Sequence, residues 1–583
     1  MAGVAAGLIA RPTAAAPAML STDDVTRIIG QAITEANDVG LPVNIAVVDR
    51  EGNILGTKKM DGAVTFTRLV GNPSFDLPPG SPAQGAEGLC VPATPDVPET
   101  FPAVNPFDPA KCPPASSING ALLAAISKAG TAAFFSTQGN AFSTRTAGFI
   151  IQPHFPPLIT NTSSGPLFGV QVSQLFCGNV IPRGLTYPPP LPPLPLGTLP
   201  LGLSGDPGGL PLYKNGRAVG GIGVEGNGRY SVDLDPTNTE VTKEEQIAAA
   251  GTHGFEAPAF IRGDRIIVGG LRFPFSNVKT VPAVAAAPVT FDPTFDVAPN
   301  TGMTRFVPET IGGVEGTVDP RYFPPRDSLD PSPADGGLVA DEVLRRLIQA
   351  ARQADRTRAG IRRPLGDRAR VNITVVDTAG NILGIFRTKD APTFGFDVSA
   401  QKARTAAFFS KATARQRLLD AGQGDFVTAA AADGIPLDGS VAFSDRAHGF
   451  VSRPFFPDGI DGTRHGPFSR SITTFSVFND GLQVELLGKA LVRLVTKGEI
   501  LPCTEIDELG NGIQIFPGSV PIYRGRTLIG AVGISGDGVD QDDIVAFAGA
   551  RGVQAPPAIR ADRLRVRGVR LPYVKFPRRP TTR

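Results

Sequence analysis

Three pairs of polar residues occupy matching places in the two halves of the 583-residue sequence, and their side chains suit the binding of a charged ligand. Lysine and arginine pair with carboxylates, and arginine does so through two parallel hydrogen bonds. Tyrosine can ligate a metal ion, although the sequence does not indicate which metal. The predicted ligand-binding residues are Lys128, Lys402, Arg145, Arg446, Tyr213 and Tyr523.

Each pair also has a structural interpretation. Lys128 and Lys402 stand on an otherwise apolar helix, so each either reaches solvent by its stem or points at an anionic ligand. The arginines pair with a carboxylate that belongs either to the protein or to a ligand. The tyrosines either ligate a metal or pack at an interface. The sequence leaves these alternatives open.

The histidines and the candidate nucleophiles do not define a second site. None of the histidines recurs in the other half, and none shows HExxH spacing. Ser444, Asp445 and His448 lie close together but lack the Gly-x-Ser-x-Gly turn of a nucleophilic serine. We therefore predict no catalytic residues. The four histidines are His154, His253, His448 and His465.

The matching residues belong to an internal duplication. Residues 44–56 recur as residues 372–384, with Asn-Ile-x-Val-Val-Asp at the start of both copies. Residues 128–136 recur as residues 402–410. Five blocks follow one another in the same order, which predicts two copies of one module. The other three matches are 141–149 with 442–450, 211–226 with 521–536, and 257–265 with 555–563.

Each copy reads as a mixture of helices and antiparallel strands. Ser21 to Asp24 form a capping-box pattern before a stripe of apolar residues at helical spacing. A Val- and Ile-rich hairpin and an Ala-rich helix follow. The glycines of residues 219–224 indicate close approach by a neighbouring helix or chain rather than a dinucleotide site. The predicted fold class is α+β, with two copies of an antiparallel sheet flanked by helices.

The predicted domain organisation follows from the repeat and from proline-rich stretches between its blocks. The 178–210 insertion, which contains Pro188 to Pro195, is expected to be an extended polyproline segment on the surface. The predicted segments are a signal-like or disordered tail at 1–19, a first domain at 20–275 with insertions at about 69–119 and 178–210, a linker at 276–335, and a second domain at 336–583.

Composition excludes several classes of protein. Hydrophobic residues make up 41% of the chain and charged residues 19%, which excludes a disordered polymer. The net charge of +2 and the absence of a basic stripe argue against a nucleic-acid partner. No stretch of about 20 apolar residues could span a membrane. The four cysteines form two disulfides, with Cys90 and Cys112 closing an insertion, or remain buried thiols.

The first eighteen residues resemble the apolar part of a secretory signal but lack its basic start. We expect a periplasmic or secreted protein, with a cytoplasmic location as the alternative.

The matched blocks resemble the GlcG/HbpS-like family, the haem-degrading or haem-binding domain also found at the C-terminus of PduO-type proteins. The resemblance rests on residues 42–52 and 59–63, the Lys-Ala-x-Thr-Ala helix, and the closing glycine-rich strand. It implies a small sheet with flanking helices that assembles into multimers. It also implies binding of haem or of a cobalamin-related ligand. The two proline-rich insertions and the C-terminal extension depart from the minimal domain.

The predicted function is the binding of haem, or of a similar flat anionic small molecule, by an exported, non-catalytic homo-oligomer. Haem as a cofactor follows from the resemblance alone. The predicted lysines and arginines would pair with the ligand's carboxylates. The alternatives are a scaffold protein with the insertions as partner-binding arms, or an enzyme of haem degradation or small hydroxy-acid metabolism.

Overall fold

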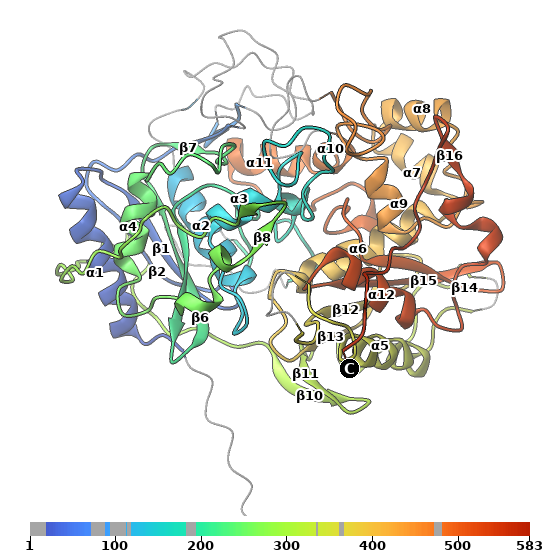
Figure 1. The fold of residues 1–583 in the computed structure, drawn as a ribbon, viewed down its shortest axis with the longest axis horizontal. Helices are drawn as coiled ribbons and strands as arrows, with labels where there is room; N and C mark the ends of the chain where they lie inside the picture. The colour runs from blue at the N-terminus through green and yellow to red at the C-terminus, as the bar shows by residue number, and fades with distance from the viewer. Residues whose placement is uncertain are drawn as a thin grey trace, which may run out of the picture.

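The computed structural model describes residues 19–70, 88–93, 112, 118–181, 194–333, 336–360, 366–471 and 481–582. The two halves of the chain lie side by side, the first coloured blue to green and the second yellow to red (Figure 1). The tail at 1–18 and most of the insertion at 69–119 lie outside the described residues.

The first half is built on a four-stranded antiparallel sheet with the order β2-β1-β6-β5. Short strands β3, β4 and β7 form a second, small sheet, and β8 and β9 form a two-stranded one. The elements are α1 (Thr22–Asp38), β1 (Asn44–Asp49), β2 (Ile54–Lys59), β3 (Thr67–Leu69), β4 (Cys90–Val91), α2 (Gly120–Phe135), α3 (Thr144–Ile150), β5 (Gly209–Lys214), β6 (Arg217–Glu225), β7 (Arg229–Tyr230), α4 (Lys243–Gly251), β8 (Ile267–Val268) and β9 (Leu271–Arg272).

The second half has a six-stranded antiparallel sheet with the order β10-β11-β13-β12-β15-β14. Its last four strands repeat the order of the first sheet. The elements are β10 (Val307–Ile311), β11 (Val314–Val318), α5 (Ala340–Ala354), β12 (Asn372–Val376), β13 (Ile382–Thr388), α6 (Gly395–Phe409), α7 (Ala414–Asp420), α8 (Gly424–Ala432), α9 (Asp445–Phe450), α10 (Leu482–Glu485), α11 (Gly488–Lys497), β14 (Ser519–Arg524), β15 (Thr527–Ser535), α12 (Val539–Gly549), β16 (Arg565–Val566) and β17 (Val569–Arg570).

Strand register agrees between the two sheets. Asn44 lies opposite Glu225 in the first sheet. In the second sheet Asn372 lies opposite Ser535, which is the counterpart of Glu225. The pairing of β1 with β2 shifts after Val47, and that of β12 with β13 shifts after Val375. The predicted α+β class and the duplication are therefore confirmed.

Helices cover both faces of each sheet. Ile45 and Val47 of β1 pack in one apolar cluster with α1 and α4, whereas Ala46 and Val48 pack in another with α2. This separation follows from the alternation of side chains along a strand. In the second half, Ile373 packs with α5 and α12, and α6 covers the opposite face.

The glycines of β6 and β15 let a helix approach each sheet closely. A Cβ on Gly223 would lie 2.0 Å from the carbonyl oxygen of Ala125 in α2. A Cβ on Gly533 would lie 2.1 Å from the carbonyl oxygen of Ser399 in α6. The interpretation of these glycines as a packing device is confirmed.

The boundary between the halves brings matching positions face to face. The ring of His154 stacks on that of its counterpart Phe455, with centroids 6.0 Å apart. Asn161 and Asp461 exchange hydrogen bonds, since the backbone N–H of each donates to a side-chain oxygen of the other. The two copies therefore meet through the same segment of each module, residues 154–161 in the first and 455–461 in the second.

All four cysteines form disulfides, Cys90 with Cys112 and Cys177 with Cys503. The second disulfide joins the two halves across 326 residues of sequence. Of the two alternatives left open by the sequence, paired cysteines are the one found.

Two segments expected to lie outside the cores pack against them. The segment 276–335 contains β10 and β11, which extend the second sheet, and its Asp296 forms an ion pair of 2.7 Å with Lys58 of β2. Residues 194–209 are almost entirely buried, and Leu199 lies against Gly130 of α2. The prediction of a surface segment is wrong for this part of the 178–210 insertion, because its leucines enter the core.

Candidate ligand cavity

Lys128 is fully buried beneath the first sheet and is neutralised within the protein. Its ammonium group lies 2.6 Å from Asp206 and 2.8 Å from Glu225. Burial alone would lower the pKa of Lys128, but the two carboxylates raise it above its usual value. Burial raises the pKa of Glu225, and repulsion by Asp206 raises it further. The positive charge of Lys128 acts in the opposite direction but does not cancel the rise.

Lys402 has the same place in the second half with fewer charges around it. Its ammonium group donates to the carbonyl oxygen of Ile534, as that of Lys128 does to Val224. It forms one ion pair, of 2.9 Å, with Asp542. The counterpart of Asp206 is Phe516, whose ring centre lies 4.6 Å from the ammonium nitrogen.

The predicted arginines link two helices in each half. Arg145 of α3 pairs with Glu245 of α4 at 2.9 Å, and Arg446 of α9 pairs with Asp543 of α12. Arg145 pairs further with Asp233 and Glu240, and Arg446 with Asp540. In both halves burial opposes the charge of the arginine, but the carboxylates raise its pKa.

The predicted tyrosines are buried against the chain that follows α2 and α6. The hydroxyl of Tyr213 donates to the carbonyl oxygen of Thr137 at 2.6 Å. Burial raises the pKa of Tyr523 to about 12. A phenol held in its protonated form is a poor metal ligand.

The structure thus does not bring the six predicted residues together in one place. Lys128, Lys402, Arg145, Arg446 and Tyr213 have partners within the protein. Of the six, Arg446 lines the large cavity described below. Ligand binding by the others stays a prediction.

His448 and Ser444 have structural roles. His448 is buried with its ring stacked on Phe409, the centroids 3.9 Å apart. The hydroxyl of Ser444 donates to the carbonyl oxygen of Tyr573 and accepts from the backbone of Ala447, which caps α9. In the described part of the chain, no group of three or more His, Cys, Asp or Glu side chains is arranged to hold a metal ion.

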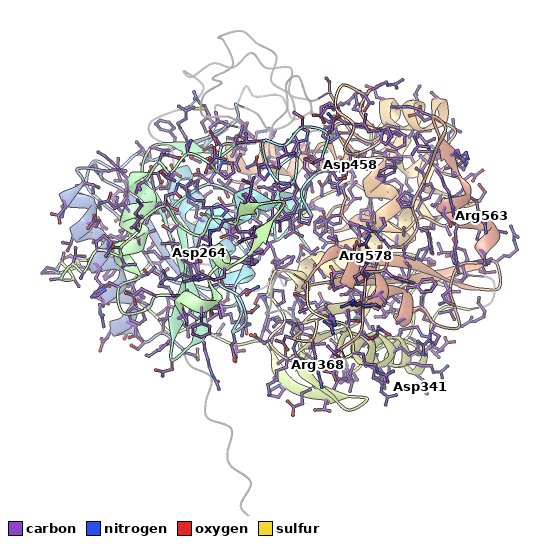
Figure 2. The ribbon with its side chains drawn as sticks, in the orientation of Figure 1. Asp264, Asp341, Arg368, Asp458, Arg563 and Arg578 are labelled. Carbon is purple, nitrogen blue, oxygen red and sulfur yellow. A yellow bond between two sulfur atoms is a disulfide. The ribbon has the colours of Figure 1, made fainter. Side chains whose placement is uncertain are left out.

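A cavity of about 770 Å³ lies between the two halves. Phe155 and residues 163–166 of the first half form one wall. Residues of α9, Arg453, Asp458, Ile515, Pro517, residues 539–540, Arg560, Asp562 and residues 570–575 of the second half form the rest. Asp458 lies where the halves meet, whereas Asp264 lies on the first half (Figure 2). Small-molecule sites have volumes of about 300–1,000 Å³. The cavity is therefore large enough for such a ligand.

The cavity combines apolar surface with cations. Its larger apolar side chains include those of Phe155, Phe450, Ile515, Val539, Leu571 and Tyr573. Its cations are Arg446, Arg453, Arg560, Arg570 and Lys575, against the carboxylates Asp458, Asp540 and Asp562. Such a lining suits a ligand with a broad apolar body and acidic groups.

Two of these arginines have no carboxylate at ion-pair distance among the described residues. Arg453 donates to the carbonyl oxygen of Ile515 at 2.8 Å and lies over the ring of Phe168. Burial lowers the pKa of Arg453, so a bound anion would stabilise its charged form. Arg560 donates to the carbonyl oxygen of Ala555 and lies over the ring of Tyr573.

The first half contains a smaller cavity of about 260 Å³ lined by Arg262 and Asp264. These residues are the counterparts of Arg560 and Asp562. Arg262 donates to the carbonyl oxygen of Ala257 at 2.9 Å and lies over the ring of Phe275, so the local geometry is the same in both halves. The counterpart of Phe275 is Tyr573, which adds a hydroxyl.

Sequence reasoning missed Arg453, Lys575 and Tyr573 because it searched for residues that both copies share. Their counterparts are Gln152, Asn277 and Phe275. The signal that could have found them is the opposite one, a gain of charge or of a hydroxyl in a single copy.

Comparison with known proteins supports the predicted resemblance. The family model described as "Haem degrading protein HbpS-like" matches residues 20–69, 340–450 and 489–551. These ranges include β1 and β2 in the first half and β12, β13, α6 and β15 in the second. Both halves therefore carry HbpS-like sequence, as predicted.

Similar solved structures include a double mutant of HbpS from Streptomyces reticuli, with 19% identity, covering 43% of this chain and 98% of that one, at a TM-score of 0.19. A complex of PduOC with haem has 18% sequence identity, covers 38% of this chain and 98% of its own, and has a TM-score of 0.19. The Klebsiella pneumoniae protein ORFY has 13% sequence identity, covers 42% of this chain and 96% of its own, and also has a TM-score of 0.19. The comparison with curated proteins finds no match.

Proposed function

We propose that this protein binds haem, or another planar ligand with carboxylate groups, in the 770 Å³ cavity between its halves. The observation that carries the proposal is the pair Arg453 and Arg560, which line an aromatic and aliphatic cavity and have no carboxylate at ion-pair distance in the part of the chain that the structure describes. Each would take a ligand carboxylate through a charge-assisted hydrogen bond. The description of the matching family, which names haem, supports the choice of ligand.

The lining fits some parts of haem better than others. The apolar side chains suit the porphyrin face, and the arginines suit the two propionates. Among the lining residues, Tyr573 has a side chain that ligates haem iron. Burial raises the pKa of Tyr573, although the charge of Arg560 acts in the opposite direction. The raised pKa disfavours the phenolate that would ligate the iron. Bound haem would bring iron chemistry to this site, while the protein's own residues hold the carboxylates and exclude water.

Export and assembly belong to the same proposal. Disulfides persist in oxidising compartments, so the two in this chain support a periplasmic or secreted protein. We retain the homo-oligomer as part of the proposal. Among the described residues, none of the helices combines the length and apolar character that crossing a membrane requires.

Titration with haemin tests the proposal. The wild-type protein should give a saturable Soret shift, and Arg560→Ala should weaken binding by at least about tenfold, since a charge-assisted hydrogen bond contributes about 1.5–3 kcal/mol. Arg262→Ala is the matched control, because it removes the same contacts from the first half. No saturable shift, or equal weakening by both variants, would contradict the proposal.

A further inference from the structure

The two halves also differ in the connection that follows β6 in the first half and β15 in the second. Between β6 and α4 the first half has residues 226–242, whereas between β15 and α12 the second half has only residues 536–538. We call residues 226–242 the plug loop. Val232 of the plug loop is buried against Gly148 of α3, where a Cβ on the glycine would lie 3.0 Å from a methyl group of Val232.

Of the space that corresponds to the open cavity, the plug loop occupies the part that lies beside Arg145 and Gly148 in the first half, next to the smaller cavity at Arg262. It supplies Asp233 and Glu240 to Arg145, at 2.6 and 3.2 Å. The counterpart of Arg145 is Arg446, and the counterpart of Gly148 is Gly449; both line the open cavity. The first half therefore fills this part of the site with its own chain.

Two neutral side chains hold the plug loop. The side-chain amide of Gln152 donates to the carbonyl oxygen of Asp233 at 2.7 Å. The side-chain amide of Asn277 donates to the carbonyl oxygen of Glu240, also at 2.7 Å. Both acceptors are uncharged backbone groups, for which an amide donor is sufficient.

The second half has a cation at each of these positions. Gly165 donates to the backbone oxygen of Gln152 at 2.8 Å, and Gly466 donates in the same way to Arg453 at 2.9 Å. The backbone N–H of Asn277 donates to Glu245, and that of Lys575 donates to Asp543 at 2.8 Å. These matching bonds establish that Arg453 corresponds to Gln152 and Lys575 to Asn277.

We infer that only the second half binds ligand, one molecule per chain, and that Arg453 and Lys575 recognise its carboxylates where Gln152 and Asn277 hold the plug loop. The inference rests on the proposed function. A cation forms a stronger, charge-assisted hydrogen bond with a carboxylate than a neutral amide does. The first half thus has amides where its plug loop is bound, and the second half has cations where an anionic ligand would bind.

The test converts the second half to the residues of the first. Haemin should bind wild type at one molecule per chain, and Arg453→Gln with Lys575→Asn should weaken binding by more than about tenfold. Iron-free protoporphyrin should show the same loss, whereas its uncharged dimethyl ester should bind both proteins alike. Arg563→Gln with Arg565→Asn is the control, because it removes two exposed cations outside the cavity.

The outcomes separate the inference from the proposed function. Two haemin molecules per chain, or unchanged binding by the double variant while Arg560→Ala weakens it, would overturn the inference and leave the function standing. Wild-type protein that binds no haemin would overturn the function itself. Since Arg453 is buried, the single variant Lys575→Asn, at an exposed side chain, must also weaken binding even if the double variant fails to fold.

Discussion

The two halves share a module, and their differences show which parts of it serve the fold and which serve binding. Both keep the four-strand order, the buried lysine under the sheet and the arginine between two helices. They differ in the plug loop and in the residues that face it. The copies share internal contacts such as the buried lysine, whereas the lining of the open cavity combines shared residues such as Arg446 and Arg560 with residues that changed in one copy, such as Arg453 and Lys575.

The charge around the buried lysine also differs between the halves, and removing it should have the largest effect. Lys128→Met leaves Asp206 and Glu225 buried without a cation, which should lower the free energy of unfolding by about 3–5 kcal/mol. Lys402→Met should cost less, because among the described residues Asp542 is the one carboxylate at ion-pair distance, the buried Asp445 interacts with Lys402 from farther away, and Phe516 is apolar. Urea denaturation measures both values. Equal losses would show that the surrounding charge does not distinguish the halves.

The disulfide between the halves should make the next largest contribution. Replacing Cys177 and Cys503 by serine should lower the free energy of unfolding by about 2–4 kcal/mol. The reason is that the unfolded chain gains more conformational entropy when the crosslink that is lost had closed a long loop. The matched variant, with serine at Cys90 and Cys112, opens a loop with a separation of only 22 residues and should lose less. Thermal melting of both variants provides the comparison, and the reverse order would contradict it.

His448, whose counterpart is Ala147, should make the stability of the second half depend on pH. Burial, and then the charge of Arg453, lower the pKa of His448 to about 3 from an ordinary value of 6.5. Between these values the unfolded chain binds a proton that the folded chain does not, so stability falls as the pH falls through this window. At pH 5 this effect lowers the free energy of unfolding by about 2 kcal/mol.

The variant His448→Phe should remove this part of the pH dependence. The difference in unfolding free energy between pH 7 and pH 5 should shrink by about 2 kcal/mol relative to wild type. His253→Gln, which replaces a half-buried histidine of the first half, is the control. An unchanged difference in His448→Phe would mean that the ring takes up its proton in the folded state.

The sequence was sufficient for the architecture because the fold rests on local patterns that occur twice. The capping box at Ser21, the Val-Val-Asp hairpin and the glycines of the central strand each predicted a contact that is present. The buried segment around Leu199 was missed because proline-rich composition describes the backbone and not the leucines between the prolines.

The candidate site was less predictable for a physical reason. Residues shared by both copies, such as Lys128 and Lys402, are retained because an unpaired buried charge is costly in either half. A binding site in one copy requires residues that differ, and a pairwise match of the copies discards them. The importance of Arg453 becomes visible only when the plug loop is seen to occupy the corresponding space.

A structure of the protein with bound haemin or iron-free protoporphyrin is the most direct test of this account. We predict one ligand per chain in the cavity between the halves, with its carboxylates at Arg453, Arg560 and Lys575 and the plug loop unmoved. A ligand bound in the first half beside Arg262, or one that displaces the plug loop from Arg145, would contradict it.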